Sequence, residues 1–169
     1  PFSEKPIACH LSDARNTHLN ENGFDFVITS PPYINVFNYH QNYRRSVELL
    51  GWDVLSVAKS EIGANRKFRS NRFLTVIQYC MDMAQVFIEL SRVCKNNAQL
   101  ILVVGRESNV RKTAFYNAEL LKTIATELLC MEFIQQQHRV FKNKFGKNIF
   151  EEILHLKVNK EFQTKSINE

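Results

Sequence analysis

The spacing of apolar residues changes along the chain, and the changes predict alternating strands and helices. Short apolar runs at residues 6–9 and 24–29 are typical of buried strands, and the second is rich in strand-forming residues. Between residues 76 and 94 the apolar positions recur every three or four residues, which predicts a helix with one buried stripe. Residues 100–104 form a continuous apolar run, as expected of a strand covered on both faces.

The remainder of the pattern predicts a second helix and a terminal hairpin. The helix is expected over about residues 113–129. Two strand-like runs, 131–141 and 149–158, are joined by a polar, basic connection and indicate an antiparallel hairpin. The long stretch after Tyr33 has weak periodicity, with a helical part expected around residues 40–50.

Strand, helix, strand, helix and hairpin together predict an α/β fold of the doubly wound type. In such folds ligands bind beyond the carboxyl ends of the parallel strands. That rule points to the segments that follow Cys9 and Thr29. With 169 residues and 44% hydrophobic content, the chain is expected to form one domain over residues 1–158, followed by a polar tail at 159–169.

Charge and cysteine content narrow the function classes. The 22 Lys and Arg against 17 Asp and Glu give a net charge of +5, which favours a polyanionic partner. No CxxC pair occurs, so neither a zinc site nor a disulfide framework is indicated, and the cysteines are expected to be buried free thiols. No uninterrupted apolar run approaches the roughly 20 residues of a membrane span, so a soluble, cytoplasmic protein is expected.

Residues 29–33, Thr-Ser-Pro-Pro-Tyr, carry the strongest chemical signal. Successive prolines stiffen the backbone in an extended form and remove two N–H donors, which leaves carbonyls free to accept. A Ser30 hydroxyl and a Pro31 carbonyl could hold an amine by its two N–H groups. Tyr33 offers a flat face on which a base extruded from a duplex can stack.

Ser30-Pro31-Pro32-Tyr33 resembles the catalytic motif of the amino-methylating DNA methyltransferases, in which Asp, Asn or Ser precedes Pro-Pro and an aromatic residue. The resemblance implies a Rossmann-like, S-adenosylmethionine-dependent fold and methylation of an exocyclic amine on flipped DNA. Serine in first place implies cytosine N4 in a restriction-modification system, whereas Asp or Asn is more usual for adenine. The alternative is a rigid turn or polyproline ligand, against which the preceding strand and the element order both argue.

The segment after the first predicted strand, residues 11–15, is similar to the family's acidic site. There a carboxylate accepts a hydrogen bond from the adenine amino group of the cofactor, a role that the resemblance gives to Asp13. Ala14 beside it and Thr29 at the end of the next strand are assigned to the same cofactor site. The alternative for Asp13 is a helix cap.

Aromatic and basic residues alternate in the stretch that follows Tyr33, as suits a loop that gathers phosphates and closes on a flipped nucleotide. The run of residues 35–40 is similar to one subgroup of cytosine-modifying enzymes. The alternative is a solvated loop with core aromatics. His40 is expected to pack or to contact phosphate, and residues 105–108 to form a structural turn. The residues assigned to DNA contacts are Asn35, Tyr39, Arg44, Arg66 and Lys67.

The sequence departs from the family in lacking a Phe-x-Gly-x-Gly cofactor loop, since the five glycines are all isolated. In the family, the strand before that loop lies beside the Pro-Pro-Tyr strand, so an open sheet edge is expected here. Three arrangements are open: an upstream segment, a second polypeptide, or a permuted order with the loop downstream. Because Asp13 precedes Ser30, the first two are favoured.

Other functions also remain open from the sequence. Related motifs act on planar amines in adenine, RNA and protein glutamine. A catalytically idle module that binds nucleic acid is a further alternative.

Overall fold

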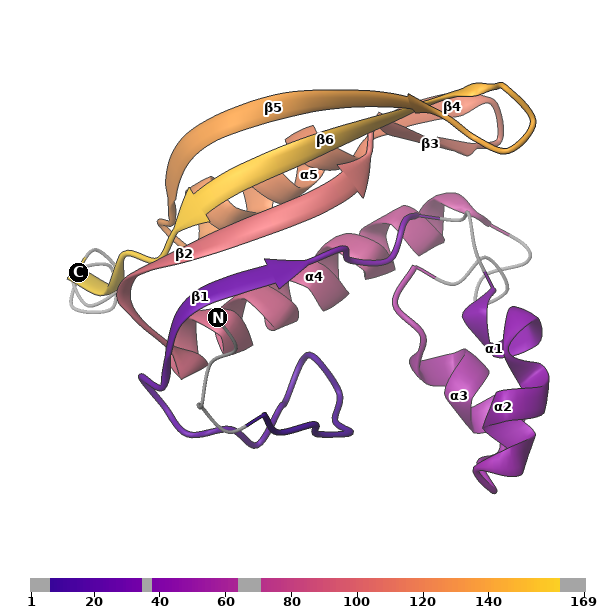
Figure 1. Cartoon of the computed structure of the whole chain (residues 1–169), viewed down its shortest axis with the longest axis horizontal. Coiled ribbons are helices and arrows are strands. Elements are labelled where there is room, and N and C mark those ends of the chain that lie inside the picture. Colours follow the sequence, from indigo (N-terminus) through magenta and orange to yellow (C-terminus); the bar gives the residue numbers. More distant parts are fainter. Residues whose placement is uncertain (1–6, 35–37, 64–70, 162–169) are drawn as a thin grey trace.

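The computed structural model describes residues 7–34, 38–63 and 71–161, and its main feature is a four-stranded mixed sheet. Only the first pair of strands is parallel, and the other two pairs are antiparallel. The strands lie in the order β1 (Phe24–Thr29), β2 (Cys94–Gly105), β6 (Asn148–Lys157) and β5 (Glu132–Lys142) (Figure 1).

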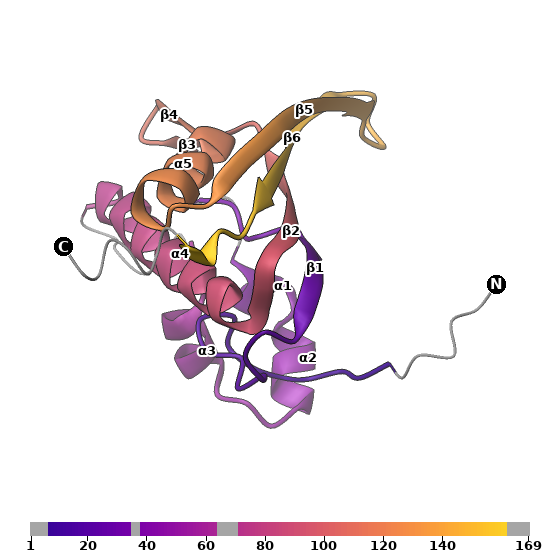
Figure 2. The same cartoon turned by 90° about the vertical axis from the view of Figure 1, so that its left-hand side faces the viewer.

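The long helix α4 (Phe73–Val93) and the helix α5 (Asn117–Thr123), which continues into the π-helical turn η1 (Ile124–Leu128), cover the same face of the sheet (Figure 2). Three short helices form a separate group beyond the carboxyl end of β1 (Figure 1): α1 (Tyr39–Asn42), α2 (Arg44–Leu49) and α3 (Val54–Ser60). The carboxylate of Asp53 starts α3 by accepting hydrogen bonds from two of its backbone N–H groups.

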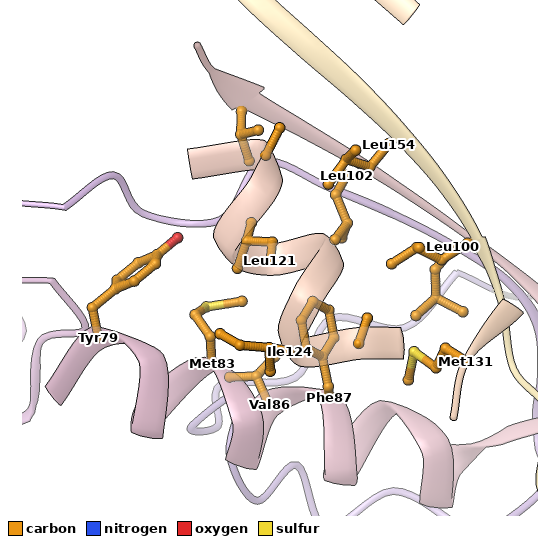
Figure 3. Packing of buried hydrophobic residues seen from close by; sticks show 14 of the residues in the cluster. Tyr79, Met83, Val86, Phe87, Leu100, Leu102, Leu121, Ile124, Met131 and Leu154 are labelled. Carbon is orange, nitrogen blue, oxygen red and sulfur yellow. The ribbon is translucent and has the colours of Figure 1, made fainter. Parts of the chain in front are cut away.

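The core forms where the buried stripe of α4 meets the alternating residues of β2. Three-and-four spacing puts Met83, Val86 and Phe87 on one side of α4, while period-two alternation turns Leu100 and Leu102 toward them (Figure 3). Side chains from α5, η1 and β6 fill the remaining space, among them Leu121, Ile124 and Leu154.

Most of the expected elements are confirmed. α4 covers the helix expected from residue 76 onward, and β5 and β6 form the expected terminal hairpin. β2 is longer than the apolar run at residues 100–104, because its polar beginning lies against the amino-terminal end of β1. The expected α/β fold class is therefore correct.

Two expectations about local structure are wrong. Within the expected strand 6–9, the described residues 7–9 are exposed and form no strand, because none of the described strands lies beside them to supply hydrogen bonds. The expected helix 113–129 begins only at Asn117. Both residues of the tight turn Arg111-Lys112 have positive φ, as in type I′ turns, so β3 (Glu107–Val110) and β4 (Thr113–Tyr116) pair as a hairpin.

Among the described helices, α4 is long and apolar enough to cross a bilayer by length and composition alone. Its inner side supplies much of the core, and its buried acids Asp82 and Glu89 are each paired with an arginine. The packing against the sheet accounts for its apolar character.

β1 forms one edge of the sheet and is poorly covered. Its side chains Phe26 and Ile28 are 50% and 67% exposed, and they point away from the face that α4 and α5 cover. The open edge expected from the sequence is therefore present, and the described helices cover one face of a sheet that doubly wound folds cover on both.

Adjacent residues of α4 give a direct test of this core. Phe87 is fully buried, whereas Ile88 is 55% exposed. We expect Phe87→Ala to lower the free energy of unfolding by about 3–5 kcal/mol, because it leaves a cavity between α4 and β2. Ile88→Ala should change it by less than about 0.5 kcal/mol. Urea denaturation at constant m-value measures both, and equal losses would contradict this packing.

Candidate functional site

A small cavity lies at the carboxyl end of β1, where the sequence places the chemistry. It has a volume of about 110 Å³ and an apolar floor formed by α4. Its wall brings together residues that the sequence assigned to two different tasks. From the expected cofactor site come Ala14 and Thr29, and from the expected catalytic motif come Ser30, Pro31 and Pro32.

The Ser30 hydroxyl is held by the neighbouring strand. Because β1 and β2 are parallel and in register up to the pair Thr29–Leu102, Ser30 comes next to Val103. Its Oγ donates a hydrogen bond to the Val103 carbonyl oxygen over 2.9 Å. A hydroxyl has one hydrogen and two lone pairs, so this Oγ can only accept from a ligand. Ser30 is exposed, and a ligand can reach it.

Tyr33 lies against the backbone at the end of β2. A Cβ added to Gly105 would come within 3.2 Å of the Tyr33 ring, so the glycine permits the close approach. Gly63 has a φ of +73°, and a Cβ there would be 3.0 Å from the Tyr33 carbonyl oxygen. The backbone and ring of Tyr33 are thus each packed against a glycine.

Two further tyrosines lie near Tyr33. Burial raises the pKa of the fully buried Tyr79, with smaller contributions from Cys80 and Tyr33. Burial also raises the pKa of Tyr39, and the neighbouring Tyr33 adds to the effect. Both phenols therefore stay protonated and neutral at physiological pH.

Asp13 does not cap a helix. Its carboxylate forms an ion pair with Arg15, whose Nη2 lies 2.6 Å from Oδ2, and this hydrogen bond holds the pKa of Asp13 below its usual value. Arg15 also pairs with the buried Asp82 of α4 over 2.8 Å. A carboxylate has about four acceptor positions, so the half-exposed Asp13 can still accept from a ligand.

Glu89 of α4 anchors the segment that follows Asp13. Its Oε1 accepts from the backbone N–H of Thr17 over 2.8 Å and from the Thr17 hydroxyl over 2.5 Å. Arg92 binds the same carboxylate and also donates to the Leu19 carbonyl. Hydrogen bonds from Arg92 and then Thr17 lower the pKa of Glu89 to about 2, although burial acts against the shift.

The residues assigned to DNA contacts are only partly placed. Tyr39 is half-buried at the start of α1, and Arg44 is exposed on α2, where it pairs with Glu48. The remaining three, Asn35, Arg66 and Lys67, lie outside the described residues.

His40 has a packing role, which is one of the two roles expected of it. It is buried in α1, and its Nδ1 lies 2.7 Å from Oε2 of Glu61. The pair ties the short helices to the segment that carries Gly63.

A second cleft at this end of the sheet was not anticipated. It has a volume of about 480 Å³ and lies between Tyr33, the end of β2 and the tip of the β5–β6 hairpin. Residues 105–108 were expected to form a structural turn, and Gly105, Arg106 and Glu107 line this cleft together with Lys147. The expected hairpin was the available signal, because its basic tip returns to the end of β2.

The cysteines differ from expectation in one respect. Cys94 is buried and Cys80 and Cys130 are half-buried, but Cys9 is exposed because its segment forms no strand. In the part of the chain that the structure describes, no cluster of His, Cys, Asp or Glu could hold a metal ion.

Comparison with known proteins identifies the fold. No protein-family model matches the chain. Over 97 residues, or 57% of the chain, it is 28% identical to the type II methyltransferase M.MjaII of Methanocaldococcus jannaschii, and it covers 18% of that protein. The chain is thus similar in sequence to part of a type II methyltransferase.

Two solved structures of TTHA0409 from Thermus thermophilus, a candidate DNA modification methylase, are also similar. One aligns with a TM-score of 0.55 at 16% identity over 89% of this chain and 53% of that chain. The other, complexed with S-adenosyl-L-methionine, aligns with a TM-score of 0.57 at 18% identity over 89% of this chain and 54% of that chain. The chain has the α/β methyltransferase fold. It spans about half the length of these structures.

The Gly105–Tyr33 contact can be tested with two matched glycines. Gly105→Ala should displace the Tyr33 ring, because a Cβ at 3.2 Å is too close. Gly23→Ala is the control, since its nearest neighbour is at an ordinary 3.5 Å and neither glycine has a positive φ. NMR shifts of the Tyr33 ring should change with the first substitution and not with the second. Unchanged shifts in both would contradict the contact.

The anchoring role of Glu89 predicts a pH dependence. A carboxylate with a pKa lowered from 4.5 to about 2 stabilises the fold above pH 4.5, and this contribution is lost as the pH falls toward 2. We therefore expect Glu89→Gln to lower the midpoint temperature of unfolding at neutral pH. Near pH 2 the midpoints of the variant and the wild type should converge. Glu48→Gln, in an exposed ion pair, is the control and should have little effect. Thermal unfolding between pH 2 and 7 measures both.

Proposed function

We propose that this chain forms the base-holding part of a DNA methyltransferase that uses S-adenosylmethionine to methylate an exocyclic amino group. The observation that carries the proposal is the Ser30 hydroxyl, whose only hydrogen is donated to Val103. An oxygen that can only accept is suited to an amine and is repelled by a carbonyl. Cytosine and adenine present an amine at the relevant position, whereas thymine and guanine present a carbonyl.

The prolines support the same chemistry. Pro31 and Pro32 have no N–H, so no backbone donor competes with the amine for the acceptors around it. Hydrogen bonds from the amine to Ser30 and to the Pro31 carbonyl would localise the nitrogen lone pair for attack. When bound, the cofactor supplies the methyl group. As the new N–C bond formed, the S–C bond to the methyl group would break and leave its electron pair on sulfur. The nitrogen would then lose a proton to solvent, which the exposed position of Ser30 allows.

The cavity beside β1 fits part of the cofactor. Ala14 and Thr29 line it, and Asp13, the residue before Ala14, is the proposed acceptor for the adenine amino group. Its volume of about 110 Å³ is smaller than the roughly 300–1,000 Å³ of sites that enclose a whole ligand of this size. We propose that a further polypeptide segment, upstream in the same protein or in a second chain, completes the site with a glycine-rich loop beside the free edge of β1.

DNA is the proposed substrate for three reasons. The similar protein from M. jannaschii is a type II methyltransferase, the chain carries a charge of +5, and Tyr33 offers a stacking face. Arg44 and Tyr39, with Asn35, Arg66 and Lys67, are the proposed contacts to the strand. Cytosine N4 in a restriction-modification system is favoured over adenine N6 because serine precedes the two prolines.

Two substitutions test this assignment in the completed enzyme. Ser30→Ala and Tyr33→Ala should each lower methyl transfer from S-adenosylmethionine to DNA by at least about tenfold, because they remove the acceptor and the stacking face. Ser60→Ala is a matched control, since its hydroxyl also donates to a backbone carbonyl over 2.9 Å but lies in α3. Transfer of a tritiated methyl group measures all three.

Unchanged transfer by Ser30→Ala would contradict the mechanism. Nucleoside analysis of the product distinguishes cytosine N4 from adenine N6. Absence of transfer to DNA by the completed wild type, with binding of DNA retained, would instead favour an idle nucleic-acid-binding module. The isolated chain is expected to bind the cofactor weakly, because its cavity is incomplete.

A further inference from the structure

Arg106 is the most firmly fixed cation in the cleft between Tyr33 and the β5–β6 hairpin. Its backbone N–H donates to the Phe150 carbonyl over 3.0 Å, and its own carbonyl accepts from Asn117 over 3.2 Å. Its guanidinium lies 4.7 Å from the centre of the Phe150 ring, and its Nε donates to Glu152 over 2.9 Å. An arginine held this way loses little entropy on binding a ligand.

Glu152 is the buried counter-charge. It is 3% exposed and also accepts hydrogen bonds from Gln136 and His138. Burial acts to raise the pKa of Glu152, but hydrogen bonds from Gln136, Arg106 and His138 outweigh it and leave the pKa below its usual value. The carboxylate is therefore ionised at neutral pH, and it balances the charge of Arg106.

This balance decides which ligand group suits Arg106. A phosphate that reached its guanidinium would also approach the negative charges of Glu152 and of Glu107, which lines the same cleft. A neutral acceptor meets no such repulsion. Lys147 also lines the cleft, and it forms no ion pair within the described residues.

We propose that Arg106 donates hydrogen bonds to the ring edge of the base lying against Tyr33, and that Lys147 binds the phosphate of the same nucleotide. The proposal rests on the proposed function, and it makes Arg106 a residue that selects the base. Next to its amine, cytosine presents a ring nitrogen and then a carbonyl oxygen, which are two adjacent acceptors. Adenine presents one ring nitrogen and then a C–H group. A forked donor therefore favours cytosine.

The test uses the full chain without cofactor and three probes: deoxycytidine monophosphate, deoxyadenosine monophosphate and deoxycytidine. Binding is followed by NMR shifts of the Tyr33 ring. The wild type should bind the cytosine nucleotide about tenfold more tightly than the adenine nucleotide. In Arg106→Gln this preference should fall below about twofold, while affinity for the adenine nucleotide changes little. Arg106→Lys should also lose the preference, because it keeps the charge but not the fork.

Lys147→Gln is the matched control in the same cleft. It should weaken the binding of both nucleotides equally and leave the binding of deoxycytidine unchanged, because deoxycytidine has no phosphate. Circular dichroism and the unfolding midpoint check that each variant is folded.

Several results would overturn the proposal. One is an equal loss of affinity for both nucleotides in Arg106→Gln, which would make Arg106 a phosphate contact. The others are an unchanged cytosine preference in that variant and the absence of a nucleotide-induced shift at Tyr33 in the wild type. This experiment measures nucleotide binding and not methyl transfer, so its result is independent of the test of the proposed function. A cytosine preference that depends on Arg106, without any transfer by the completed enzyme, would contradict only the methyltransferase assignment.

Discussion

The parallel pairing of β1 with β2 fixes the geometry of the site. It brings Thr29 opposite Leu102, so the next residue, Ser30, meets the Val103 carbonyl and donates its only hydrogen there. A shift of one residue would turn each β1 side chain to the other face of the sheet and remove this contact. The same alignment carries the stiff Pro-Pro segment past the end of β2, where Tyr33 comes to lie on Gly105.

Buried charges hold the surrounding segments against this pair of strands. Each is matched by a partner from another element, as low-exposure charges require. Asp82 and Glu89 of α4 bind the segment before β1 through Arg15 and Thr17, and Glu152 of β6 holds Arg106 at the end of β2. The polar residues of the core thus position loops at the carboxyl ends of the strands, while the apolar stripe of α4 supplies the packing.

The sheet also has an uncovered edge and an uncovered face beside the site. β1 exposes aromatic and aliphatic side chains, and among the described strands it has a neighbour on one side only. The chain spans about half the length of the similar methyltransferase structures.

Local signals in the sequence were enough to predict several elements. The period of α4, the apolar run of β2, the terminal hairpin and the rigid Ser-Pro-Pro-Tyr segment all depend on residues close together in the chain. Contacts between distant residues decided the rest. Residues 7–9 form no strand because none of the described strands pairs with them, and Asp13 binds Arg15 because α4 holds that arginine. Arg106 joins the site because residues 46 positions apart, Arg106 and Glu152, meet across two strands, a contact that no local pattern encodes.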